Sequence, residues 1–262
     1  MRTALSRSLS AVAAFAAVSA LAVFTPWGQR LDDGSLGSFA WIPASALIGE
    51  LRTPGLVLAV AAFAVTVVVR LMIGPRLVVF CLIAAVVFGY VVCVLLRDIA
   101  IVRPGWGIGD YDTNTLPSAH TVVAAMAFAS LVALAPGAWP GRVLVGLGAC
   151  CAFLAAVGSV ASHAHRGADV IAGLLLAATI VPWASCWSAP VRTPRWLMWA
   201  AATWVPLAGL SIALAHTAAW PVASSIALAW ACAVLVALVG CWARRPVLRR
   251  TGHPRDTPTP GA

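Results

Sequence analysis

Long apolar runs alternate with short polar segments along most of this chain. A run of about 20 apolar residues is long enough for a helix to cross the hydrocarbon core of a bilayer, and Pro and Gly mark several of the turns between runs. The pattern predicts an all-α fold, a polytopic membrane helix bundle with eight transmembrane helices. The predicted helices cover 8–25, 54–70, 77–96, 118–136, 143–163, 167–187, 197–217 and 221–242.

Three longer polar segments interrupt this pattern. The segments 26–53 and 97–117 are predicted loops, and the Pro-rich segment 243–262 is predicted to be a disordered basic tail. The first apolar run follows two arginines and resembles a signal peptide. Because the run continues as far as Phe24, we interpret it as a membrane anchor that is retained.

The composition supports a membrane protein and excludes two other classes. The 262 residues are 62% hydrophobic and 10% charged, with a mean hydropathy of +0.96, so the chain is too apolar for a soluble domain. The net charge of +9 does not indicate a nucleic-acid partner, because the arginines lie in short loops and in the tail. The seven Cys lie in or at the ends of apolar runs without metal-ligand spacing, which favours packing over disulfides or zinc.

The distribution of arginine predicts the orientation. Most of the 17 basic side chains fall on one side if the N-terminus is cytoplasmic, and seven of the eight acidic residues then fall on the other side. The positive-inside rule therefore places both termini in the cytoplasm. We expect a multi-pass protein of a bacterial plasma membrane.

Polar residues of unusual type gather on the predicted outer side. Segments about 65 residues apart in the sequence can meet there, because each lies at the outer end of a predicted helix. These residues are Arg97 and Arg103 after the third helix, Ser118 and His120 at the start of the fourth, and His165, Arg166 and Asp169 between the fifth and sixth.

His165 and Asp169 are four residues apart and share a face if they are helical. A carboxylate that holds one imidazole nitrogen fixes the tautomer and leaves the other nitrogen free to attack. A carboxylate at the start of an apolar helix is also costly without a partner. The alternative is that Asp169 simply forms an ion pair with Arg166.

Ser118 is a predicted N-cap, and the N–H groups of a helix N-terminus attract anions. His120 lies in the first turn of that helix, where a purely structural role is the alternative. Arg97 and Arg103 suit bidentate recognition of a phosphate, and Pro104 takes Arg103 out of helical geometry, so the two can converge. Anchoring beside lipid headgroups is the alternative for both arginines.

Taken together, these residues suit phosphoryl transfer through a histidine nucleophile without a metal. Arginines and backbone N–H groups would stabilise charge on the phosphoryl oxygens, and the second histidine could protonate the leaving oxygen.

The motifs "RDIAIVRP" at 97–104, "PSAH" at 117–120 and "HRGAD" at 165–169 occur in this order. With them the chain resembles the type-2 phosphatidic acid phosphatase superfamily, membrane lipid phosphatases related to vanadium haloperoxidases. The resemblance covers about 54–187. The stretch from Gln29 to Asp33 also looks like family members.

The resemblance implies a role for each matching residue. His165 would form a phosphohistidine, Asp169 would orient it, and His120 would be the general acid. The phosphate would be bound by Arg97, Arg103, Ser118 and the backbone of Ala119. The family core has six helices, so 1–187 would be this core and 188–242 would add two helices. No cofactor or metal is implied.

The chain departs from the family pattern at three places. Arg97 stands where Lys is usual, one residue closer to the Arg-Pro pair, and Ala119 replaces Gly. The Ser-Arg pair that precedes the histidine is absent, because Gly158 and Ser159 occupy its positions. Arg166 is a candidate to supply the missing charge.

The sequence thus predicts a membrane phosphatase acting on a lipid phosphate or diphosphate at the outer face. Polyprenyl diphosphate, phosphatidate and phosphatidylglycerol phosphate are candidate substrates. Two other readings stay open: transfer of the phosphate to another lipid or a sugar, and a catalytically inactive lipid-binding protein. A transporter is disfavoured, because the chain has no inverted repeat and no charged residue in mid-helix. The oligomeric state is not indicated.

Overall fold

The computed structural model describes residues 2–73, 76–108, 113–135, 139–184 and 217–243, with a few positions between 203 and 214. All elements in these residues are helical. They are α1 (Arg2–Phe24), α2 (Pro26–Gly34), the 3-10 turn η1 (Ser35–Gly37), α3 (Ser45–Glu50), α4 (Arg52–Ile73), α5 (Arg76–Leu95), the π-helical turn η2 (Leu96–Ala100), α6 (Ala119–Leu134), α7 (Trp139–Ala161), α8 (Gly167–Ala184) and α10 (Trp220–Ala243).

Six helical stretches in the described part of the chain are long and apolar enough to cross a membrane. They are Ala4–Phe24, Ser45–Ile73, Arg76–Ala100, Trp139–Ala161, Gly167–Ala184 and Trp220–Ala243. This confirms the all-α fold and indicates a multi-pass membrane protein. The predicted count of eight is not reached, because α6 has only 16 residues and the predicted helix 197–217 lies mostly outside the described residues. The predicted tail, apart from Ala243, also lies outside them.

The helix α6 lies at the centre of the bundle. It packs against α4, α5, α7, α8 and α10, and Val122, Met126 and Leu131 are almost completely buried. Alanines at 124, 125, 127 and 129 are buried as well, and such small side chains allow neighbouring helices to approach closely. By contrast, α4 and α5 expose many valines and leucines, as expected for helices that face lipid.

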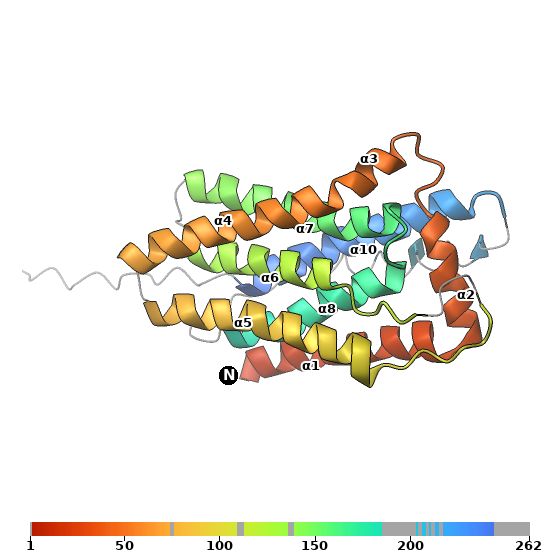
Figure 1. The fold of residues 1–262 in the computed structure, drawn as a ribbon, viewed down its shortest axis with the longest axis horizontal. Coiled ribbons are helices and arrows are strands. Elements are labelled where there is room, and N and C mark those ends of the chain that lie inside the picture. The colour runs from red at the N-terminus through yellow and green to blue at the C-terminus, as the bar shows by residue number, and fades with distance from the viewer. Residues whose placement is uncertain are drawn as a thin grey trace, which may run out of the picture.

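The last described helix, α10, belongs to the same bundle as the first six predicted spans. It packs against α6, α7 and α8 (Figure 1). The contact with α6 is close, because a β-carbon at Gly240 would lie 2.7 Å from Cζ of the buried Phe128.

The substitution Gly240→Ala should therefore destabilise the bundle. We expect overpacking against Phe128 to lower the free energy of unfolding by about 1–3 kcal/mol. Gly146→Ala in α7 is the matched control, because a β-carbon there meets nothing within 4 Å and alanine favours the helix. Thermal unfolding in detergent measures both variants. Equal midpoints would argue against tight packing of α10 on α6.

The segment 26–53, a predicted loop, contains three short helical elements. Thr25 begins α2 as its N-cap, with its side chain accepting a hydrogen bond from the Gly28 N–H, and Pro26 follows at the first helical position. These elements lie at one end of the bundle (Figure 1). The C-terminal ends of α1, α5 and α7 and the N-terminal ends of α4, α6 and α8 meet at the same end.

Candidate active site

His120, His165 and Asp169 come together at this end of the bundle. His165 lies in the connection between α7 and α8, Asp169 in the first turn of α8, and His120 in the first turn of α6. Nδ1 of His165 is 3.5 Å from Oδ2 of Asp169, which is an ion-pair distance and too long for a good hydrogen bond. The rings of the two histidines are 6.3 Å apart between centroids, at an interplanar angle of 61°.

Hydrogen bonds fix Asp169 in this position. Its Oδ2 accepts from Thr115 Oγ1 at 2.5 Å and from the Arg166 N–H at 2.9 Å. Its backbone carbonyl accepts from the Ser118 N–H at 2.9 Å, which ties the start of α8 to the start of α6. Because Asp169 is almost completely buried, these bonds hold the carboxylate beside His165 rather than in solvent.

The backbone of His165 is attached to the end of α7. Its N–H donates to the Ser159 carbonyl at 3.0 Å. Nδ1 of the buried imidazole has no hydrogen-bond partner in the described part of the chain and faces Asp169. The other ring nitrogen, Nε2, is therefore the one available for chemistry.

The N-terminus of α8 is capped largely by side chains from α2 and η1. Ser35 Oγ accepts from the Gly167 N–H at 2.7 Å, and Asp32 Oδ1 accepts from the Ala168 N–H at 2.9 Å. Together with Asp169, which accepts from Arg166, they satisfy three N–H groups of this terminus. The segment after the first transmembrane helix thereby positions the turn that carries Asp169.

Arg103 binds to the same network behind the histidines. Its Nη2 donates to Asp32 Oδ2 at 2.8 Å and to the Ala22 carbonyl at 3.0 Å, and the side chains of Arg103 and Asp32 are 6% and 2% exposed. Burial and the nearby Asp169 carboxylate raise the pKa of Asp32 above its ordinary value, whereas the Ala168 N–H and Arg103 act in the opposite direction. Arg103 thus already has a carboxylate partner.

Arg97 also has a carboxylate partner. In η2 it forms a two-pronged ion pair with the adjacent Asp98, with Nε 2.6 Å from Oδ1, and both side chains are partly exposed. Among the described residues, no hydrogen bond or ion pair links the Arg97 side chain to either histidine or to Arg103. The convergence of the two arginines on one anion stays a prediction.

The remaining predicted residues lie close to the histidines in the sequence. The Arg166 guanidinium is buried and forms an ion pair with Asp33, with Nε 3.5 Å from Oδ1. Ser118 occupies the N-cap position of α6, but its side chain makes no capping bond and accepts instead from Thr121 Oγ1 at 3.2 Å. Ala119 is the first residue of α6.

Sequence reasoning did not identify several residues that surround the site. Asp32, Asp33 and Ser35 come from a predicted loop, and the signal for the two aspartates was the family-like stretch Gln29–Asp33, to which no role was assigned. Thr115 carries no pattern that marks it. Arg52, at the start of α4, is close enough for its charge to act on His120.

No protein-family model, no curated protein and no solved structure matches this chain. The likeness to the phosphatidic acid phosphatase superfamily therefore depends on the three motifs and the Gln29–Asp33 stretch. The chemistry that the described geometry supports depends on three side chains, which are the imidazoles of His120 and His165 and the carboxylate of Asp169.

Proposed function

We propose that the protein is a membrane phosphatase that hydrolyses a lipid phosphate or diphosphate through a phosphohistidine on His165. The observation that carries the proposal is the grouping of His165, Asp169 and His120, with both imidazoles within reach of one phosphoryl group. The arginine distribution favours a site on the outer face. The apolar tail of the substrate would remain in the bilayer.

In the first step, Nε2 of His165 attacks the phosphorus. The bond from phosphorus to the leaving oxygen breaks, the electron pair stays on that oxygen, and a protonated His120 donates its proton to it. Asp169 stabilises the positive charge that develops on His165. In the second step, water attacks the phosphohistidine, the phosphorus–nitrogen bond breaks, and the water proton passes to His120.

The test is phosphate release by the purified protein in detergent, without added metal and with EDTA present. We expect release from a polyprenyl diphosphate or a phosphatidate, and acid-labile, base-stable labelling when the terminal phosphate carries ³²P. Release that stops with EDTA, or a label with the stability of phosphoserine, would overturn the mechanism. A labelled lipid or sugar in place of free phosphate would indicate transfer.

His120→Ala should slow the reaction in a way that depends on the leaving group. Loss of a general acid costs a factor of about 10²–10⁴ when the leaving oxygen is basic. We expect that loss with a phosphatidate or polyprenyl phosphate, and a much smaller loss with p-nitrophenyl phosphate, whose phenolate leaves without a proton. Equal losses with both kinds of substrate would argue against proton donation by His120.

A specific observation favours a second candidate, a catalytically inactive lipid-binding protein. Arg97 and Arg103, the two arginines that the family resemblance assigns to phosphate, are paired with Asp98 and Asp32. The second function replaces the first if the wild-type protein is well folded and binds lipid phosphates, but neither releases phosphate nor passes it to an acceptor.

A further inference from the structure

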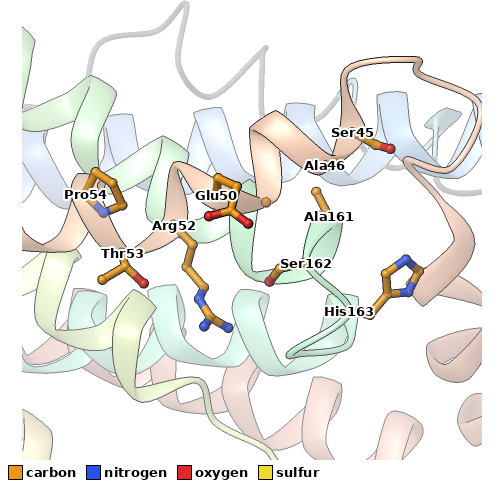
Figure 2. Close-up of a pocket in the computed structure, with 10 residues that line it drawn as sticks. Ser45, Ala46, Glu50, Arg52, Thr53, Pro54, Ala161, Ser162 and His163 are labelled. Carbon is orange, nitrogen blue, oxygen red and sulfur yellow. The ribbon is translucent and has the colours of Figure 1, made fainter.

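A polar pocket of about 510 Å³ lies where α3 meets α4, beside the connection that carries His165. Its lining includes Ser45, Glu50, Arg52, Ser162 and His163 (Figure 2). None of these residues was predicted to belong to the site. The pocket therefore offers a place for a polar part of the substrate that the three sequence motifs do not account for.

Close backbone packing brings Arg52 to this place. A β-carbon at Gly158 of α7 would lie 2.8 Å from the Ile48 carbonyl oxygen and 3.0 Å from the Arg52 nitrogen. A β-carbon at Gly49 would lie 3.1 Å from the backbone of Ser162. The start of α4 thus occupies the space beside Gly158, one of the two positions at which the family pattern has its Ser-Arg pair.

Arg52 forms no ion pair with any carboxylate in the described part of the chain, although Glu50 lines the same pocket. Among the described residues its guanidinium forms no hydrogen bond or ion pair, and Figure 2 shows the side chain extending away from Glu50. Arg103 and Arg97, by contrast, each have an aspartate partner. The charge of Arg52 also acts on His120, so Arg52 and a protonated His120 repel each other. An anion between them would relieve that repulsion.

The geometry points to Arg52 as the residue that binds the leaving phosphate of a lipid diphosphate, next to His120. This inference rests on the proposed function, in which His120 serves the leaving oxygen. When His165 attacks the terminal phosphorus of a diphosphate, the bridging oxygen takes the electron pair and remains on a lipid monophosphate. That product is an anion, which a guanidinium stabilises by charge-assisted hydrogen bonds.

A lipid monophosphate requires less stabilisation of charge on its leaving group at the same site. Its leaving group is an alcohol, which is neutral once His120 has protonated it, so Arg52 has little charge to stabilise on that side. The pocket therefore selects the diphosphate class of substrate over the monophosphate class. Arg52 acts in the transition state as well as in binding, because charge on the leaving phosphate grows as the bond breaks.

The experiment compares a polyprenyl diphosphate with the monophosphate that has the same tail. In the wild-type protein we expect a higher kcat/KM for the diphosphate. Arg52→Ala should lower kcat/KM for the diphosphate by a factor of about 100 or more, the scale for loss of one charge-stabilising donor, and should change the monophosphate value only a few-fold. Arg52→Lys should give an intermediate value, and added guanidinium should restore part of the diphosphate activity of Arg52→Ala.

Arg30→Ala is the matched control, because Arg30 is an exposed arginine on α2 at the same end of the bundle. It should leave both values unchanged. The inference would be overturned if Arg52→Ala kept the wild-type preference for diphosphate. It would also be overturned if Arg52→Ala lost activity equally on both substrates and guanidinium did not restore it. If Arg52→Ala does not fold, the ratio of the two kcat/KM values in Arg52→Lys decides by the same criterion.

The His165→Ala variant separates this inference from the proposed function. If His165→Ala is inactive while Arg52→Ala keeps the diphosphate preference, only the role of Arg52 fails. If the wild-type protein releases no phosphate, the proposed function fails, and binding then tests Arg52. In that case polyprenyl diphosphate should bind Arg52→Ala at least 10-fold more weakly than it binds the wild-type protein, and equal affinities would overturn the inference.

Discussion

Replacement of His165 by alanine is expected to lower the rate of phosphate release by a factor on the order of 10⁴ or more, because the proposed nucleophile is lost. The ³²P label on the protein should disappear as well. The fold should survive, because the buried imidazole contributes no hydrogen bond through Nδ1 and its backbone N–H bond to Ser159 does not depend on the side chain.

Two further variants make this result interpretable. His253→Ala removes an imidazole from outside the described residues and should retain full activity. Asp169→Asn should give a large but smaller loss than His165→Ala, since the nucleophile remains while its orienting carboxylate is replaced. If His165→Ala, folded and monodisperse, retained more than a small fraction of wild-type activity, another residue would have to carry the phosphoryl group.

The transmembrane helices could be predicted from the sequence because their signal is strong and local. Runs such as 77–96 and 143–163 are apolar on all sides, and α5 and α7 follow them closely. The short helix α6 was predicted as a full span, since its flanking residues are also apolar. It has 16 residues and lies inside the bundle, surrounded by other helices.

The meeting of His165, Asp169 and His120 could also be predicted, from their spacing and because each lies at the outer end of a predicted helix. His165 precedes α8 and is not helical, so the predicted shared helix face does not apply; the bond from the Arg166 N–H to Asp169 instead holds the carboxylate beside His165.

The partners of the arginines could not be predicted in this way. Arg103 pairs with Asp32 across 71 residues, and Arg97 pairs with its own neighbour Asp98. Which carboxylate a guanidinium selects depends on how the helices pack. For the same reason Arg52 appeared in the sequence only as one of two arginines in the predicted loop 26–53, while in the structure the Gly49 and Gly158 contacts bring it beside the site.

Replacement of Asp32 by asparagine is expected to have the largest effect on stability. It would leave Arg103 buried without a carboxylate, and the asparagine amide could not serve both the Arg103 Nη2 and the Ala168 N–H as two carboxylate oxygens do. Breaking a buried ion pair by removing one partner costs about 3–5 kcal/mol. We therefore expect a large fall in the midpoint of thermal unfolding in detergent. Activity should fall too, because Asp32 caps the helix turn that carries Asp169.

Asp98→Asn is the matched control, since it removes the same charge from an ion pair whose side chains are 29% and 48% exposed. Exposed pairs contribute little to stability because solvent screens them, so its unfolding midpoint should stay close to that of the wild-type protein. Both variants lose an arginine–aspartate pair at the same end of the bundle, and only burial and the cap on α8 distinguish them. Equal midpoints for Asp32→Asn and Asp98→Asn would therefore show that neither the Asp32–Arg103 pair nor the Asp32 cap on α8 contributes much to stability. In that case the position of Asp169 would depend on its own bonds to Thr115, Arg166 and Ser118 and on the Ser35 cap at the start of α8.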